Sequence, residues 1–372
     1  MKVPVCEPSI GKQELKNVSE CVKSGWISGY KGKYIDEFEQ RFATYCGAKY
    51  GVTTTSCATA LLLAMETMGI GKGDEVITAD FTMLATVAAI VRAKAKPVLV
   101  DALPDTWCID PEKIVAKITP KTKAIMPVPI YGHPVDAKEM MRLALKYDLR
   151  VIEDAAEAIG AVYEGGHRVG AIFNATCFSF YVNKLITTGE GGMVLTNNKE
   201  FADSMRRMKG YDTDPESRFI HQRLGFNYRL TNMQAAIGCA QMDRIDEFAL
   251  RKRQIAEMYT EQLKGIEELT LPVERKECVN AYWVYGILLP DKVDRDEFIG
   301  KLADMEVETR RFFYPMHKQP ALIKLGLCTG KETEFPVSNY ISERGVYLPN
   351  GVTLTDEQVG YVCDCIKGLL NG

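Results

Sequence analysis

The stretch Cys177-Phe-Ser-Phe-Tyr-Val-Asn-Lys-Leu-Ile-Thr-Thr-Gly-Glu-Gly-Gly192 places a single lysine between an apolar run and a glycine-rich turn. Apolar residues are frequent in 175–182 before Lys184 and in 193–196 after it, and short runs bounded by glycine are typical of strands. We therefore expect two strands joined by the turn, with Lys184 just beyond the end of the first strand.

Upstream of this stretch, β-rich runs alternate with helical patterns. The runs cover 75–78, 97–100, 123–130 and 150–152, and the helical patterns include 83–93 and 136–147. This alternation predicts an α/β fold with a mainly parallel sheet of about seven strands, covered by helices. Ligands of such sheets bind beyond the carboxyl ends of the strands, so we expect functional residues to follow strands.

Two further helices are predicted before the sheet, and a helix leads away from it. Apolar residues recur at helical spacing at Leu15, Val18 and Val22, and again at Tyr34, Phe38 and Phe42. Glycines at 25 and 47 end these runs. A helical pattern over 231–263 becomes dense with charge after residue 243 and marks a domain boundary near residue 245.

Two domains of unequal size follow from this boundary. The chain has 372 residues, which exceeds one typical single-core domain. Residues 1–245 form the predicted large α/β domain. Residues 246–372, with a strand near 282–289 and helices near 294–305 and 356–370, form a smaller α+β domain.

Composition and charge argue for small-molecule chemistry. The chain is 46% hydrophobic and 26% charged, and 46 basic residues against 49 acidic ones leave a net charge of −3. No basic excess points to nucleic acid or to an anionic membrane. The longest stretch without Asp, Glu, Lys or Arg, residues 50–65, is shorter than the roughly 18 residues of a spanning helix. The N-terminus lacks the apolar core of a signal peptide, so we expect a cytoplasmic protein.

Cysteine and histidine spacing argues against a metal site. The eleven cysteines include no CxxC pair, and the four histidines lie far apart. Reduced, mostly buried thiols are expected, and no metal ligand set is predicted.

Two side chains near strand ends carry candidate chemistry. Apolar neighbours favour a neutral amine at Lys184, and a neutral amine forms Schiff bases; a surface lysine after a strand is the alternative. Asp154 follows the apolar pair Val151-Ile152 and could hold a protonated pyridine nitrogen, or it could cap a helix. A hydroxyl-rich segment, 53–59, precedes an apolar helix, and such helix starts bind phosphate.

These segments together resemble the DegT/DnrJ/EryC1/StrS family of vitamin-B6-dependent sugar aminotransferases. The markers are 73–77, 118–125, 151–156, 178–180 with Lys184, and 189–192, in the family's order and over nearly the whole chain. The resemblance implies a fold-type I aminotransferase: a mainly parallel seven-stranded sheet in an α/β/α arrangement, with a smaller α+β C-terminal domain.

The resemblance also implies how pyridoxal 5′-phosphate (PLP) is bound. Lys184 would be the lysine that links covalently to the cofactor and later carries the proton. Asp154 would pair the pyridine nitrogen. Ser179 would bind the phosphate, together with the backbone N–H groups of Ala58 and Thr59.

Three further positions follow from the family pattern. Asn227 would reach the phosphate from the neighbouring subunit, which implies a homodimer with shared active sites. Met83 stands where many relatives have an aromatic ring over the cofactor, and its thioether could pack on the ring face. Glu157 stands where many relatives have Gln beside the cofactor's phenol oxygen, so we expect a proton shared between the two oxygens.

Substrate contacts are suggested for five residues. Trp26 and Ser28 would line the entrance for the nucleotide sugar, although Trp26 could equally pack on the first helix. Arg229 and Arg310 would bind anionic groups, because guanidinium suits carboxylate and phosphate, or would form structural ion pairs. His317 would touch the substrate or be satisfied within its loop.

Within the family, segments 25–28, 218–221, 225–232 and 315–317 resemble members that aminate GDP-4-keto-6-deoxymannose for O-antigen and related polysaccharides. The implied reaction moves an amino group from L-glutamate to a nucleotide-linked 4-keto-6-deoxyhexose in a ping-pong cycle; UDP- or dTDP-linked sugars are the alternatives. A PLP-dependent sugar dehydratase is less favoured, because such relatives have histidine in place of Lys184. A non-catalytic sensory protein is disfavoured by the complete set of Lys184, Asp154 and Ser179.

Overall fold

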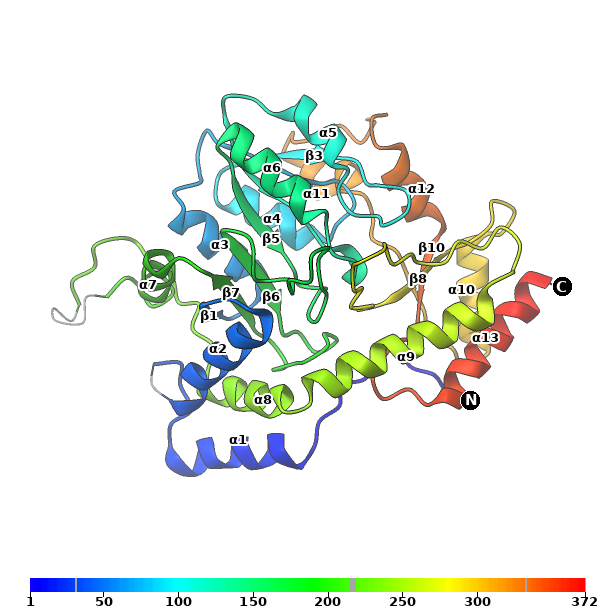
Figure 1. Cartoon of the computed structure of the whole chain (residues 1–372), viewed down its shortest axis with the longest axis horizontal. Coiled ribbons are helices and arrows are strands. Elements are labelled where there is room, and N and C mark those ends of the chain that lie inside the picture. The colour runs from blue at the N-terminus through cyan, green and yellow to red at the C-terminus, as the bar shows by residue number, and fades with distance from the viewer. Residues whose placement is uncertain (31, 214–218, 332, 372) are drawn as a thin grey trace.

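The computed structural model describes residues 1–30, 32–213, 219–331 and 333–371. A seven-stranded sheet dominates it, with the strand order β1-β7-β6-β5-β4-β2-β3 (Figure 1). The strands are β1 (Tyr50–Thr54), β2 (Glu75–Ala79), β3 (Lys96–Val100), β4 (Thr122–Met126), β5 (Arg150–Asp154), β6 (Ala175–Ser179) and β7 (Gly192–Thr196). Only β7 runs against its neighbours, β1 and β6, while the other pairings are parallel. The predicted fold class is confirmed.

The helices before residue 245 pack on this sheet or on one another (Figure 1). They are α1 (Lys12–Ser24), α2 (Lys33–Cys46), α3 (Cys57–Thr67), α4 (Leu84–Arg92), α5 (Pro111–Ile114), α6 (Ala137–Tyr147), α7 (Lys199–Met208) and α8 (Asn232–Met242). Apolar spacing explains their burial: Phe38 and Phe42 of α2 are fully buried, and so are Leu61 and Leu63 of α3. The site described below lies where the sheet meets α3 and α4.

Helix α1 forms where the spacing predicts it, yet it buries the opposite face. Leu15 and Val22 are 70% and 61% exposed, whereas Glu14, Asn17 and Cys21 are buried. Asn17 Nδ2 donates to the carbonyl of Ala236 in α8 at 3.1 Å, and the Glu14 carboxylate accepts a hydrogen bond from α8. Polar groups with partners inside the protein thus cover α8, and the apolar stripe is left on the surface.

Two strands differ from the sequence-based expectation. The predicted strand 123–130 ends at Met126, because Pro127 and Pro129 lack the N–H that a sheet ladder requires, and residues 130–132 form a 3-10 turn. Strand β1 was not expected, since its residues read as the approach to a phosphate-binding helix. It pairs along its whole length with β7 and closes one edge of the large sheet.

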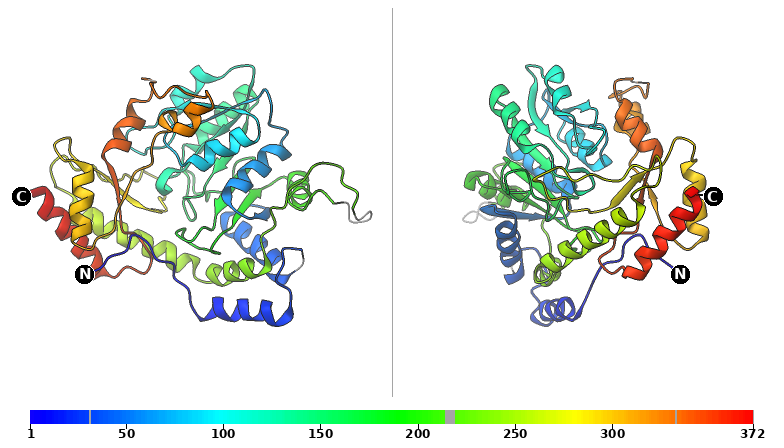
Figure 2. Two further views of the ribbon diagram at one scale, coloured as in Figure 1. Left: turned by 180° about the vertical axis from the view of Figure 1, so that it is seen from behind. Right: turned by 45° about the vertical axis from the view of Figure 1, so that its right-hand side comes forward.

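A second, three-stranded sheet lies at the end of α9 (Ile245–Leu263). Its antiparallel order is β8-β10-β9, with β8 (Tyr285–Leu288), β9 (Arg310–Arg311) and β10 (Gly345–Leu348). The helices of this part are α10 (Arg295–Asp304), α11 (Pro320–Lys324), α12 (Pro336–Arg344) and α13 (Asp356–Asn371). Figure 2 shows α9 running from the end of α8 toward α13.

The predicted boundary near residue 245 stays a prediction. Helix α8 ends at Met242 and α9 begins at Ile245. The amino terminus crosses between the two parts, because Val3 pairs with Val307 and lies in the apolar core beside the second sheet. Within the described ranges, no helix is both long and apolar enough to span a bilayer.

Candidate active site

Four segments meet at one edge of the large sheet. Asp154 ends β5 and is paired with Cys177 of β6, and Ser179 ends β6. Gly192 begins β7 and is paired both with Ser179 and with Thr54, the last residue of β1. Because β7 runs antiparallel to its neighbours, its first residue lies where β1, β5 and β6 end. Asp154 and Ser179 therefore share the carboxyl edge at which ligands of α/β sheets bind.

Asp154 is buried and held by its own chain. Thr86 Oγ1 of α4 donates to Asp154 Oδ2 at 2.7 Å, and Cys57 Sγ of α3 donates to Oδ1 at 3.5 Å. Burial raises the pKa of Asp154, and the hydrogen bond from Thr86 opposes that rise. A carboxylate fixed in this way is suited to a charge-assisted hydrogen bond with a protonated ring nitrogen.

Lys184 lies in the turn after β6. Its N–H donates to the Tyr181 carbonyl at 2.9 Å, and its Nζ lies 3.5 Å from the centroid of the Trp283 indole ring. Burial lowers the pKa of the Lys184 amine, and the negative charge of Glu157 opposes this effect. The neutral, nucleophilic form of the amine is consequently more accessible than in an exposed lysine.

Glu157 lies one turn beyond Asp154 and is 5% exposed. Its Oε2 accepts the backbone N–H of Tyr131 at 2.8 Å. Burial raises the pKa of Glu157 to about 7, while the charge of Lys184 and the Tyr131 hydrogen bond act in the opposite direction. Near neutral pH this carboxyl group is therefore poised to hold or release a proton.

The first turn of α3 lies against β7. Ser56 caps the helix: its Oγ accepts the Thr59 N–H at 3.2 Å, and Thr59 Oγ1 accepts the Ser56 N–H at 3.0 Å. This cap occupies the Thr59 N–H, whereas the first-turn N–H groups of Cys57 and Ala58 have no acceptor within the helix. A Cβ at Gly192 would lie 2.4 Å from the Ser56 carbonyl, so glycine permits this close approach.

The arrangement fits PLP. Asp154 offers the partner for a ring nitrogen, Lys184 offers an amine, and Ser179 with the start of α3 offers donors for a phosphate. Met83 is half-exposed at the N-cap of α4, where its Sδ accepts the Ala85 N–H at 3.0 Å. Met83 lies one turn before Thr86, which donates to Asp154, so α4 positions both Met83 and Thr86.

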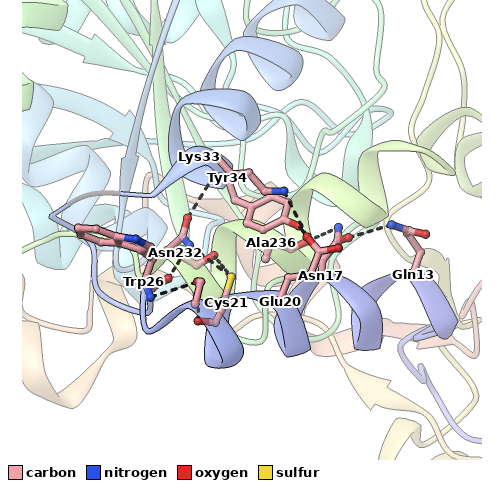
Figure 3. A network of polar contacts seen from close by, with 10 residues as sticks. Gln13, Asn17, Glu20, Cys21, Trp26, Lys33, Tyr34, Asn232 and Ala236 are labelled. Atoms are coloured by element: carbon pink, nitrogen blue, oxygen red, sulfur yellow. Dashed lines mark hydrogen bonds and ion pairs between the residues drawn. The ribbon is translucent and has the colours of Figure 1, made fainter.

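Trp26 and Ser28 lie in the loop between α1 and α2. Figure 3 shows Trp26 beside Asn232, the first residue of α8. Asn232 Nδ2 donates to the Trp26 carbonyl at 2.6 Å, and the Asn232 N–H donates to the Ser28 carbonyl at 3.3 Å. The Trp26 side chain is 55% exposed and lines a surface pocket of about 760 Å³ with Tyr34. The backbone of this loop is thus anchored, while the indole ring stays open to a ligand or to another protein.

Arg310 lies on the same side of the fold as Glu157. It is in β9 and pairs with Tyr347 of β10, whose ring centroid is 6.2 Å from that of Tyr131. The Tyr131 N–H in turn binds Glu157. The guanidinium of Arg310 is exposed, and its hydrogen bond to the Thr309 carbonyl is local.

Asn227 is hydrogen-bonded to a neighbouring arginine of its own chain. Its exposed Oδ1 accepts hydrogen bonds from Arg229 Nε and Nη2 at 3.2 and 3.1 Å. Among the described residues, no hydrogen bond joins Asn227 to Ser179 or to the first turn of α3. The predicted contact of Asn227 with the cofactor of a neighbouring subunit stays a prediction.

His317 is fully buried rather than open to a ligand. Its Nδ1 and its N–H each lie 2.8 Å from an Asp80 carboxylate oxygen, and its ring stacks on Phe335 with centroids 4.7 Å apart. These contacts hold Nδ1 and the backbone within the fold, whereas the buried Nε2 has no hydrogen-bond partner among the described residues, so the contact of His317 with the substrate stays a prediction. Arg218, in the predicted segment 218–221, lies outside the described residues.

Sequence reasoning missed three residues that shape the site. Thr86 donates a hydrogen bond to Asp154, and the Tyr131 N–H donates one to Glu157. The indole ring of Trp283 faces Lys184. Thr86 had a weak signal in the sequence. It follows Met83, the predicted ring-stacking residue, by one turn of a helix that is expected to face the sheet. Nothing in the sequence brings Trp283, 99 residues further on, to Lys184.

A buried carboxylate, a lysine with a lowered pKa and phosphate donors at one sheet edge define a PLP-dependent aminotransferase. Residues 8–367 match the model of the DegT/DnrJ/EryC1/StrS aminotransferase family. The chain therefore belongs to this family, whose members are PLP-dependent sugar aminotransferases.

Similar proteins cover the whole chain. GDP-perosamine synthase of Escherichia coli O157:H7 is 41% identical over 365 residues, 98% of each chain, and that of Vibrio cholerae is 40% identical over 371 residues, 99% of each chain. The crystal structure of DesV from S. venezuelae is 30% identical, with a TM-score of 0.93 over 100% of this chain and 99% of that one.

Proposed function

We propose that the protein transfers the amino group of L-glutamate to the 4-keto carbon of GDP-4-keto-6-deoxymannose, giving GDP-perosamine and 2-oxoglutarate. The observation that carries this proposal is the identity of about 40% to GDP-perosamine synthases across nearly the full length of both chains. A cytoplasmic location and a role in polysaccharide biosynthesis belong to the same proposal.

The side chains at the sheet edge have distinct tasks in this reaction. When bound, PLP supplies an aldehyde that takes up the amino group and a ring that withdraws electrons. Asp154 orients the ring and keeps its nitrogen protonated. The Lys184 amine, with its lowered pKa, takes a proton at Nζ from the amino-donor carbon and later returns one to the sugar carbon.

Glu157 completes the proton arrangement. Its carboxyl group, with a pKa of about 7, would share a proton with the phenol oxygen of the ring, because two adjacent anions repel each other. The Tyr131 N–H fixes Oε2, which leaves the other carboxyl oxygen to hold this proton.

The substrate assignment is tested by presenting the PLP-loaded protein with L-glutamate and with GDP-, UDP- or dTDP-linked 4-keto-6-deoxyhexoses. We expect amino sugar and 2-oxoglutarate in equal amounts with the GDP-linked sugar, measured by mass spectrometry. Turnover confined to UDP- or dTDP-linked sugars would contradict the GDP assignment but keep the aminotransferase. Release of water without 2-oxoglutarate would instead identify a dehydratase.

We further propose that two copies form a homodimer whose active sites are shared. Three observations support this. Leu15 and Val22 leave an apolar stripe of α1 exposed, and Leu224 in the segment between α7 and α8 is 97% exposed. Asn227 lies in the same segment and is not hydrogen-bonded to the phosphate donors of its own chain in the described structure. Large apolar side chains exposed in this way favour a protein partner.

Mixing two inactive variants tests shared sites directly. A Lys184→Ala chain lacks the amine, and an Asn227→Ala chain lacks the residue offered to its neighbour. If Asn227 acts across the interface, a mixed dimer contains one intact site, and exchange of subunits restores activity. An Asn227 that acts within its own chain gives no restoration, and light scattering of either variant reports the number of subunits.

A further inference from the structure

A second lysine is buried near the site. Lys252, in the second turn of α9, is only 2% exposed. Its Nζ donates to the Trp283 carbonyl at 2.9 Å and to the Asn350 carbonyl. Both acceptors are backbone carbonyl oxygens. Among the described residues, Lys252 forms no ion pair with a carboxylate. A buried amine without an acidic partner is costly and is therefore unusual as a purely structural choice.

Trp283 connects Lys252 with Lys184, because it contacts both side chains. Trp283, whose carbonyl binds Lys252, presents its indole ring 3.5 Å from Lys184 Nζ. The indole Nε1 donates to the Asn183 carbonyl at 2.9 Å, and Asn183 directly precedes Lys184. One amine on α9 thus anchors the residue that contacts the catalytic lysine and its neighbouring backbone.

The second acceptor belongs to the other sheet. Asn350 follows β10, and its Nδ2 donates to the Tyr282 carbonyl at 2.6 Å. Its N–H donates to the Val5 carbonyl at 3.0 Å. Lys252 therefore lies where α9, the start of β8, the end of β10 and the N-terminal segment converge.

The two amines also affect each other electrostatically. The pKa of Lys252 is lowered to about 8, mainly by burial; Cys6 opposes this shift, and the charge of Lys184 acts in the same direction as burial. The groups that face Lys184 are the acidic Glu157 and Asp154 and the thiols of Cys57 and Cys6. All of these favour a protonated Lys184. Because like charges repel, a protonated Lys252, whose own pKa the charge of Lys184 lowers, acts in the opposite direction and favours the neutral Lys184 amine.

We propose that Lys252 is a positioning residue for the transamination, which anchors Trp283 beneath Lys184 and supplies a positive charge that keeps the Lys184 amine neutral. The proposal rests on the role of Lys184 given above. Lys252 acts through another side chain and does not itself touch the substrate.

Four variants of the full chain separate charge from packing. Lys252→Met removes both the charge and the donor, Lys252→Gln keeps a donor without the charge, and Lys252→Arg keeps the charge. The matched control is Arg253→Met, the next cation on α9, which forms an exposed pair with Glu274 instead. Circular dichroism establishes which variants are folded, and Lys252→Gln carries the test if Lys252→Met is not.

The readout is the protonation of Lys184 in the cofactor-free chain. Trace acetic anhydride is applied from about pH 6 to pH 11, and mass spectrometry of the Lys184 peptide gives the apparent pKa of that amine. We expect Lys252→Gln and Lys252→Met to raise this pKa by about half a unit or more. Lys252→Arg and Arg253→Met are expected to leave it at the wild-type value.

An unchanged pKa in both neutral variants would overturn the proposal, and so would an equal rise in Lys252→Arg. Failure of the underlying function is recognised separately. In that case borohydride and PLP would not label Lys184 in the wild-type chain, whatever the titration of the cofactor-free chain shows.

Discussion

The carboxyl edge of the large sheet and the outer loop at residues 25–30 differ in how far the chain itself satisfies their polar groups. At the sheet edge, Asp154 and Glu157 are at most 5% exposed, and each accepts hydrogen bonds from fixed donors of the same chain. In the outer loop, only the backbone is anchored, and the Trp26 side chain is 55% exposed.

We infer from this difference that the sheet edge carries the catalytic groups and that the outer loop contributes to substrate specificity. Groups that are buried and held from several elements keep one geometry before any ligand arrives, which favours a common reaction. Exposed side chains acquire their contacts from the substrate or from a second subunit. We therefore expect substitutions at the sheet edge to affect turnover and substitutions in the loop to affect substrate binding.

The largest effect is expected for Lys184→Ala. Loss of the amine that moves the proton should lower turnover by at least about 10²- to 10⁴-fold, the range of general acid–base catalysis. Formation of 2-oxoglutarate from L-glutamate and the keto sugar is the measurement. Lys199→Ala, which removes an exposed lysine paired with Asp203, is the control and should be as active as wild type. Equal losses in both variants would contradict a special role for Lys184.

A smaller loss is expected for Asp154→Asn. Replacing a charge-assisted hydrogen bond to the ring nitrogen should cost about 1.5–3 kcal/mol, or roughly 10- to 150-fold in turnover. The neighbouring Glu153 points to the opposite face of the sheet, where Tyr163 and Thr176 donate to it, so Glu153→Gln is a matched control. The comparison fails if Glu153→Gln lowers turnover as much as Asp154→Asn does.

The two regions also differ in how well the sequence predicted them. Lys184 and Asp154 lie at or just beyond the ends of apolar strands, and strand ends in an α/β sheet meet at one edge, so the local pattern indicated both as candidates, whereas Ser179 was assigned through the family resemblance. Trp283 and Lys252 come from distant segments, and only tertiary packing brings them to Lys184. Such contacts leave no periodic signal in one sequence.

The errors have equally local causes. The apolar stripe of Leu15 and Val22 correctly indicated a helix, but polar contacts of Glu14 and Asn17 with α8 determined which face is buried. For His317, the sequence left open whether it contacts the substrate or is held within its loop, and this question stays open. Its partner, Asp80, is 237 residues away, so the buried pair could not be foreseen from spacing.

Glu157→Gln should change the pH dependence of stability by on the order of 2 kcal/mol. Glu157 has a pKa of about 7 in the folded chain, against an ordinary value near 4.3 when unfolded. Between these values the folded state holds more protons, so the contribution of Glu157 to stability is present at low pH and is lost as pH rises toward 7. The unfolding temperature of the cofactor-free variant should therefore rise relative to that of wild type as the pH increases from about 5 to about 8.

With PLP bound, the same variant tests the shared proton. We expect the titration of the cofactor's visible absorbance to shift when Glu157 is replaced by Gln, because the amide cannot exchange a proton with the phenol oxygen. A titration that is unmoved would refute the shared proton, and stability curves of identical pH dependence would refute the raised pKa.

The smallest effect on the fold is expected for Trp26→Ala. Because the ring is half-exposed and Asn232 holds only its backbone, stability should change by about 0.5 kcal/mol or less. The KM for the nucleotide sugar should rise several-fold while the KM for L-glutamate stays constant, as steady-state kinetics would show. Equal changes in both values would place Trp26 outside the sugar-binding surface.

The most direct test of the central claim is chemical labelling of the lysine at the sheet edge. Borohydride reduction of the PLP-loaded protein, followed by peptide mass mapping, should place the cofactor on Lys184. A cofactor found on Lys252 or on another lysine, or no covalent adduct at all, would contradict the account.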